Sequence, residues 1–262
     1  MIRTETAKEV LDMRIFLDTA RLDEIREVVP LGFISGVTTN PSLMLESGRA
    51  DWREVVREIC YLVQGHVSAE VLSTDVGGMV REAKEIATWS PYVGVKIPTT
   101  PAGLTAISRL SKEEVDLERL CQGCAWYGKC DTDIDAAREL AAGLGIQTNG
   151  TLVFSPNQAL FAARAGASFV SPFVGRLDET GQDGIQVVSN IVEIFRAYGI
   201  ETQVVAASLR HPMHIVQAAL AGADAATVHY PVLMKALRHP LTELGVERFL
   251  ADWTQLQSYP RR

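Results

Sequence analysis

The chain has 262 residues, of which 47% are hydrophobic and 22% charged, and its formal net charge is −7. This apolar fraction excludes a disordered chain, and no apolar run approaches the roughly 20 residues that a membrane-spanning helix needs. Nothing near the start resembles a secretory signal. The acidic excess makes nucleic acid a poor partner, although a few local arginines could still bind a small anion. We expect a cytoplasmic, enzyme-sized protein, with a length close to that of one (β/α)8 barrel.

Short apolar runs alternate along the chain with longer amphipathic segments. The predicted strands are residues 14–18, 36–39, 67–72, 92–97, 147–153, 169–173, 203–206 and 225–228. The main predicted helices are residues 21–29, 52–63, 79–88, 157–165, 184–198 and 212–221. Short runs rich in Val and Ile are typical of strands buried on both faces of a parallel sheet. The pattern therefore predicts an α/β fold, a single TIM barrel. An open doubly wound sheet is the alternative, but no glycine-rich turn follows the first strand and no linker divides the chain.

Two segments do not fit the alternation. Residues 112–135 form a charged insertion between the fourth and fifth strands, and residues 131–144 are predicted to be its exit helix, capped by Asp131 or Asp133. Residues 240–259 are predicted to form an extra C-terminal helix with Trp253 and Leu256 on one face. This helix is expected to pack on the barrel or to reach a neighbouring subunit.

Lys96 interrupts an apolar strand near its carboxyl end. Inside a barrel, burial lowers the pKa of an amine toward neutrality, and a neutral amine is what Schiff-base chemistry with a ketone or aldehyde requires. The alternative is a lysine buried in an ion pair.

Other polar side chains lie at the carboxyl ends of predicted strands, where the active sites of TIM barrels assemble. Asp18 ends the first strand and Glu70 lies in the third; each could instead cap a helix or pair with Lys96. Asn40 and the pair Asn149 and Thr151 add hydrogen-bonding groups, although singly they are ordinary turn residues.

An anion site is predicted late in the chain. Arg176 follows the sixth strand, and Ser208 and Arg210 follow the seventh. Two guanidinium groups and a hydroxyl can hold a tetrahedral oxyanion. The alternative is that these are surface arginines paired with Asp178 or Glu179.

These residues lie in stretches that resemble the transaldolase family, in particular its short microbial branch that includes fructose-6-phosphate aldolase. The matching stretches are IFLDTA (15–20), GVTTNPSL (36–43), VKIP (95–98), TLVFS (151–155), SPFVGRLD (171–178) and AASLR (206–210). The resemblance covers the chain from Met13 to about Trp253, apart from the insertion, and it also implies a TIM barrel.

The resemblance implies roles for individual residues. Lys96 corresponds to the lysine that forms a Schiff base with a ketose, and Asp18 to the acid/base that deprotonates the C4 hydroxyl so that the C3–C4 bond breaks. Glu70 and Thr151 correspond to the pair that holds a catalytic water. The implied substrate and phosphate contacts are Asn40, Asn149, Ser171, Phe173, Arg176, Ser208 and Arg210. Because the protonated imine already stabilises the carbanion, the implied mechanism uses neither a metal nor a cofactor.

Two residues favour group transfer over simple aldol cleavage. Aldolase-like members tend to have Gln at the position of Glu70 and Tyr at the position of Phe173. The resemblance thus implies a transaldolase that moves a dihydroxyacetone unit from fructose 6-phosphate or sedoheptulose 7-phosphate to an aldose phosphate. A fructose-6-phosphate aldolase-like enzyme is the alternative. The family also suggests a homo-oligomer of five or ten subunits.

The chain departs from the family pattern at two places. The insertion 112–135 is absent from typical short members. Family chains usually begin at the position of Met13, so residues 1–12 are expected to be an extension or the result of an upstream start codon, ahead of a barrel spanning residues 13–262.

The insertion carries Cys121, Cys124 and Cys130, while Cys60 lies far away in the sequence. This spacing is half of a zinc motif, which a nearby aspartate could complete, but reduced thiols packed with the neighbouring aromatic residues are the favoured interpretation. Two further hypotheses stay open. One is a relative acting on another anionic ketose, such as a sulfonated one; the other is a barrel that serves as a metal-binding or assembly module.

Overall fold

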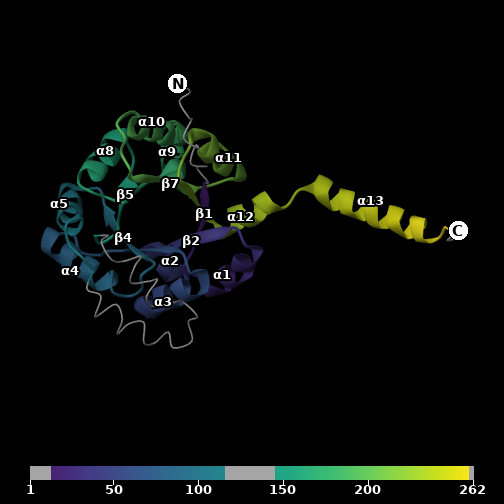
Figure 1. The fold of residues 1–262 in the computed structure, drawn as a ribbon, viewed down its shortest axis with the longest axis horizontal. Coiled ribbons are helices and arrows are strands. Elements are labelled where there is room, and N and C mark those ends of the chain that lie inside the picture. Colours follow the sequence, from purple (N-terminus) through teal and green to yellow (C-terminus); the bar gives the residue numbers. More distant parts are fainter. Residues whose placement is uncertain (1–12, 116–144, 260–262) are drawn as a thin grey trace, which may run out of the picture.

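The computed structural model describes residues 13–115 and 145–259. Eight parallel strands close into a barrel in sequential order, β1 to β8, and helices surround it (Figure 1). The strands are β1 (Arg14–Asp18), β2 (Ile34–Thr38), β3 (His66–Glu70), β4 (Val93–Pro98), β5 (Thr148–Val153), β6 (Phe169–Pro172), β7 (Gln203–Leu209) and β8 (Ala225–His229). The predicted TIM barrel is confirmed, and the open doubly wound sheet is wrong.

Helices follow the strands around the outside of the barrel. They are α1 (Leu22–Val28), the 3-10 turn η1 (Val29–Leu31), α2 (Pro41–Glu46), α3 (Trp52–Val63), α4 (Val76–Ile86), α5 (Pro101–Leu110), α8 (Pro156–Arg164), α9 (Val174–Asp178), α10 (Gly184–Ala197), α11 (Pro212–Ala221), α12 (Tyr230–Leu237) and α13 (Pro240–Gln257). The six main predicted helices are present. Helix α4 starts three residues before its predicted start because Asp75 caps it by accepting the backbone N–H of Gly78.

The outward faces of the strands and the inner faces of the helices form the main core. Valines such as Val37, Val67 and Val95 are fully buried there. Since successive strand residues point to opposite faces, Lys96 then lies on the face turned toward the barrel interior.

The amino half of the barrel interior is filled by aromatic side chains. Phe16 and Phe169 form a small buried cluster with Val205 and Ala225. The His66 ring lies against both phenyl rings, with centroids 5.4 Å and 4.6 Å away. Burial and the charges of Arg14 and Lys96 lower the pKa of His66 to about 3, so this imidazole is neutral.

The polar part of the interior lies at the other end of the barrel, where the strands end.

Within residues 13–115 and 145–259, no helix is long and apolar enough to cross a membrane. Helix α13 projects away from the barrel, as Figure 1 shows, and the side chains of Phe249 and Trp253 are 71% and 58% exposed. The predicted exit helix 131–144 and Cys121, Cys124 and Cys130 lie outside the described residues.

Candidate active site at the carboxyl end of the barrel

Lys96 lies inside the barrel on β4 and is only 3% exposed. Its neighbours in the strand register are Glu70 on β3 and Asn149 on β5. The amine donates a hydrogen bond to the backbone oxygen of Thr39 at 3.1 Å. Among the described carboxylates, none lies within the 4.0 Å of an ion pair with this amine. The interpretation of Lys96 as one half of a buried ion pair is therefore wrong.

Two carboxylates share this end of the interior with Lys96. Asp18, at the end of β1, accepts a hydrogen bond from the Thr38 hydroxyl at 2.7 Å. Glu70 is mostly buried, and that burial raises its pKa; the charge of Lys96 acts in the opposite direction, and that of Asp18 adds to the rise. Glu70 is thus influenced by the charges of both Lys96 and Asp18 without a direct ion pair to the lysine.

Neutral polar groups on β5 and β6 complete the interior wall. Ser171 donates a hydrogen bond to Oδ1 of Asn149 at 2.8 Å, and both side chains are buried. Nδ2 of Asn149 and Oγ1 of Thr151 are buried with no hydrogen-bond partner in the described part of the chain. A buried polar group left unpaired costs about 1–3 kcal/mol. This cost makes both atoms good candidates for contacts with a ligand or water.

Asn40 lies at the rim and also has a structural task. Its Oδ1 accepts the backbone N–H of Leu43 at 3.0 Å and so caps α2. Asn40 therefore has the turn role that is usual for asparagine. The cap uses only the side-chain oxygen and leaves the amide nitrogen for other contacts.

Arg176 lies on α9, which packs against β7, and Ser208 and Arg210 lie at the end of that strand. Gly175 lies so close to Ser208 and Arg210 that a Cβ there would be 2.4 Å from the Ser208 backbone oxygen and from Cγ of Arg210. Ser208 is buried and has a left-handed φ of 59°, while both arginines are exposed.

The predicted surface pairing of these arginines is present in part. Nε of Arg210 lies 3.4 Å from Oε1 of Glu179, with both side chains about half exposed. An exposed pair of this kind contributes little stability, so an incoming anion could compete for the guanidinium. Phe173, which precedes α9, packs edge-on against Phe154 at a centroid distance of 5.8 Å.

Several residues of the site were not predicted from the sequence. Nε2 of His229, at the end of β8, lies 3.3 Å from Oδ2 of Asp18. Thr227 contacts the Thr38 hydroxyl at 2.5 Å. Of these residues, Thr38 lies in the matching stretch GVTTNPSL, and that stretch is the sequence signal that could have identified it.

His214 was also missed, and it holds the loop that carries Arg210. Its Nδ1 accepts the backbone N–H of Arg210 at 3.2 Å, and its Nε2 lies 3.1 Å from Asp178. Asp178 in turn accepts the N–H of Gly184 at 2.9 Å. The imidazole thereby links the end of β7 to α9 and α10.

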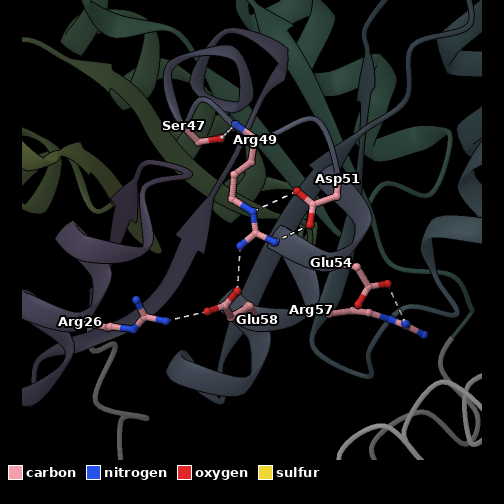
Figure 2. Close-up of polar contacts among 7 residues, drawn as sticks. All are labelled: Arg26, Ser47, Arg49, Asp51, Glu54, Arg57 and Glu58. Atoms are coloured by element: carbon pink, nitrogen blue, oxygen red, sulfur yellow. Dashed lines mark hydrogen bonds and ion pairs between the residues drawn. The ribbon is translucent and has the colours of Figure 1, made fainter.

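A mainly apolar cavity of about 280 Å³ adjoins the site and is lined by Asn40, Glu70 and Trp52, among others. Arg49 forms part of its wall and organises the loop between α2 and α3 (Figure 2). The guanidinium contacts both oxygens of Asp51 and also Glu58 at 2.9 Å. Glu58 also accepts a hydrogen bond from Arg26 of α1 at 2.6 Å, so this wall is tied to two helices.

A second cavity, of about 740 Å³, opens at the amino end of the barrel. It borders Arg14 and His66 and contains none of the predicted site residues. The chemistry-bearing side chains predicted from the sequence lie at the opposite end of the barrel.

Fold and site together define a TIM-barrel protein with a buried lysine and two carboxylates at the carboxyl mouth, the end where barrel enzymes assemble their active sites. A model of the family described as Transaldolase/Fructose-6-phosphate aldolase matches residues 15–119 and 128–259. The chain belongs to this family. The match is interrupted at residues 120–127, within the predicted insertion.

Curated relatives support the same assignment. A "Probable transaldolase" of Heliobacterium modesticaldum is 50% identical over 94% of this chain and 99% of its own length. Proteins of the same name from Roseiflexus castenholzii and Methanococcus maripaludis are 50% and 49% identical; the alignments cover 94% and 92% of this chain, and 99% and 97% of theirs. Among solved structures, a protein cage designed by fusing symmetric oligomeric domains shares the fold at 12% identity, with a TM-score of 0.50, covering 94% of this chain and 80% of that one.

Proposed function

We propose that this protein is a Schiff-base transaldolase, which moves a dihydroxyacetone unit from a ketose phosphate to an aldose phosphate. The donor would be fructose 6-phosphate or sedoheptulose 7-phosphate. The observation that carries the proposal is the Lys96 amine, buried inside the barrel and bonded only to a backbone oxygen among the described residues. An amine held in this way is available as a nucleophile toward a carbonyl.

The proposed reaction begins when Lys96 attacks the ketose carbonyl and water leaves to give a protonated imine. Asp18 accepts the C4 hydroxyl proton, the C3–C4 bond breaks, and its electrons move to the iminium to form an enamine as the first aldehyde leaves. The enamine then attacks the second aldehyde, whose oxygen takes the proton back from Asp18. Hydrolysis of the new imine releases the product ketose and regenerates the amine.

Glu70 and Thr151 would hold the water that moves protons during imine formation and hydrolysis. Burial raises the pKa of the Glu70 carboxyl group, which makes it a better proton donor and acceptor for this work than an exposed carboxylate. The unpaired Oγ1 of Thr151 could bind the same water.

The substrate would lie between the imine and the arginines. Asn40, Asn149 and Ser171 would bind hydroxyl groups beside the imine, and Phe173 would border them. Arg176, Ser208 and Arg210 would bind the phosphate. Two guanidinium groups beside a hydroxyl suit a tetrahedral dianion.

The covalent step can be tested directly. Borohydride reduction with fructose 6-phosphate should trap one adduct per wild-type chain, and Lys96→Met should lose both the adduct and the turnover. Lys235→Met, an exposed lysine on α12, is the matched control and should behave as wild type. An active, trappable Lys96→Met variant would overturn the proposal and favour a binding or assembly role.

The substrate class is tested by supplying acceptors. Transfer from fructose 6-phosphate to erythrose 4-phosphate, with little free dihydroxyacetone, supports a transaldolase. Release of dihydroxyacetone without an acceptor supports the aldolase alternative. Turnover of a sulfonated ketose but not of fructose 6-phosphate would identify the sulfonated ketose as the donor, since the arginine pair suits either tetrahedral group.

We further propose a cytoplasmic homo-oligomer of five or ten subunits, in which residues 13–262 form the barrel unit and residues 1–12 an extension. The support from the structure is α13, whose apolar side chains are exposed within the single chain. Burial of such side chains against a second copy would remove this surface from water.

A further inference from the structure

His229 lies where it can act on the predicted acid/base. It is the last residue of β8, and its partner in the strand register is Asp18 on β1. Side chains of register partners in parallel strands point to the same face of the sheet. The imidazole therefore shares the interior mouth of the barrel with the carboxylate of Asp18.

The usual task of a residue at this position is to cap the next helix. His229 is the N-cap residue of α12, yet its side chain makes no capping hydrogen bond. Instead Nε2 lies 3.3 Å from Oδ2 of Asp18. The side chain is directed to the site and not to the helix that follows.

Each oxygen of Asp18 has a polar neighbour in this arrangement. Oδ1 accepts the Thr38 hydroxyl at 2.7 Å, and that hydroxyl contacts Thr227 at 2.5 Å. Oδ2 faces His229, whose side chain is 28% exposed, while that of Asp18 is 8% exposed. The imidazole, which is the more exposed of the two side chains, thus lies beside the carboxylate oxygen that Thr38 does not hold.

We propose that His229 is a positioning residue that holds Asp18 as an oriented carboxylate. This inference rests on the proposed function, in which Asp18 accepts the C4 hydroxyl proton and returns it to the oxygen of the second aldehyde. Because the proton given up in cleavage is used again in condensation, His229 has no proton to carry to solvent. Its task is to aim Oδ2, which an imidazole can do when its Nε2 carries a proton.

The charged groups that share this environment are Glu70 on β3 and Lys96 on β4. They lie two and three strands away from β1, whereas His229 is on the strand next to Asp18. Removal of the imidazole should therefore change catalysis through Asp18 and leave the amine chemistry of Lys96 unaltered.

The test compares His229→Leu and His229→Gln with wild type. We expect His229→Leu to lower kcat roughly tenfold or more, to leave KM within about threefold, and to keep the borohydride-trapped adduct. His229→Gln should recover part of the rate, because its amide can donate to Oδ2.

His239→Gln, an exposed histidine at the start of α13, is the matched control and should match wild type. A His229→Leu variant with normal kcat, beside an inactive Lys96→Met variant, would overturn this inference alone. Full turnover by Lys96→Met would overturn the proposed function instead. Loss of the adduct in both His229 variants, with melting curves like wild type, would also contradict a role confined to Asp18.

Discussion

Lys96 and Glu70 face each other across neighbouring strands, yet the side chains do not form an ion pair. The amine is bonded to the Thr39 backbone oxygen, and the carboxyl group is left mostly buried with a raised pKa. A buried pair of opposite charges gains stability only when the geometry brings the charges together. Because the Lys96 amine and the Glu70 carboxyl group are not paired, both can react with other groups, as expected at a functional site.

Glu70→Gln gives a stability prediction with a definite sign. The pKa of Glu70 is higher in the folded protein than in the unfolded chain, so folding favours its protonated form. The resulting stability is present below the ordinary pKa of Glu and is lost as the pH rises through the raised value. The neutral Gln should therefore increase the free energy of unfolding at pH 8 and give a smaller gain at pH 4.5.

Urea denaturation of the two proteins at both pH values measures this difference. Glu193→Gln, an exposed carboxylate on α10, should give no such dependence on pH. Turnover by Glu70→Gln should fall about 10²-fold, the usual contribution of an acid/base group. Equal or lower stability than wild type at pH 8 would show that the carboxyl group is paired in solution.

At the scale of elements, strands pass into helices through capped turns at the rim of the barrel. Asn40, Thr100 and Ser155 each accept the N–H three residues on, and a proline follows each as the first helical residue. A polar side chain at a strand end can thus have no task other than to cap the helix that follows. For Thr100 and Ser155 this simple role is sufficient, whereas Asn40 also reaches the cavity beside Glu70.

Gly175→Ala tests how α9 delivers Arg176 to the end of β7. The added Cβ would meet Ser208 and Arg210 at 2.4 Å, so α9 must move away from β7. We expect a loss of about 1–3 kcal/mol in stability. The KM for fructose 6-phosphate should rise about tenfold or more, because the proposed contact between Arg176 and the phosphate would be weakened.

The matched control is Gly245→Ala on α13, where a Cβ has open space. Adduct formation between Lys96 and unphosphorylated dihydroxyacetone should stay normal in Gly175→Ala. A proportional loss for both substrates would instead indicate general damage to the barrel.

All eight strands could be predicted from the sequence because each is an apolar run buried on both faces. Their ends were less certain: β7 extends to Leu209, three residues past its prediction, since the small and polar residues Ala207 and Ser208 hide the continuation. Helix α9 spans only five residues, too few for a helical period to be visible.

The site residues also differ in how well the sequence predicts them. Lys96 and Asp18 stood out because ionisable side chains are unusual in apolar strands. His229 did not, since a histidine before Tyr230 and a proline is an ordinary turn residue, and its contact with Asp18 joins the first and last strands. Closure of the barrel creates that contact, and no local pattern contains it.

At the scale of the molecule, the barrel interior is divided along its axis. The aromatic cluster of Phe16, His66 and Phe169 fills the amino half, and Gly94 makes room for it, because a Cβ there would lie 2.4 Å from the His66 ring. Polar side chains fill the other half. The proposed site therefore lies at one mouth of the barrel, above a floor of packed aromatic side chains.

Helix α13 carries many exposed apolar side chains. Leu241, Leu244, Phe249, Trp253 and Leu256 are 54–71% exposed, and they recur at spacings of three to five residues along the helix. A stripe of this size on a helix that makes no close packing with the described barrel is stable in water only if another surface covers it. Since the proposed oligomer offers many copies of the same barrel, a second copy is the expected cover.

Phe249→Asp with Trp253→Asp should therefore convert the oligomer to monomers, measured as molar mass by light scattering after size-exclusion chromatography. Glu247→Ala, a polar position on the same helix, is the matched control and should keep the wild-type mass. The barrel core does not involve α13, so the monomer should keep its far-UV spectrum and the trappable Lys96. An unchanged mass in the double variant would place the subunit contacts elsewhere on the barrel, and α13 would then need a different partner.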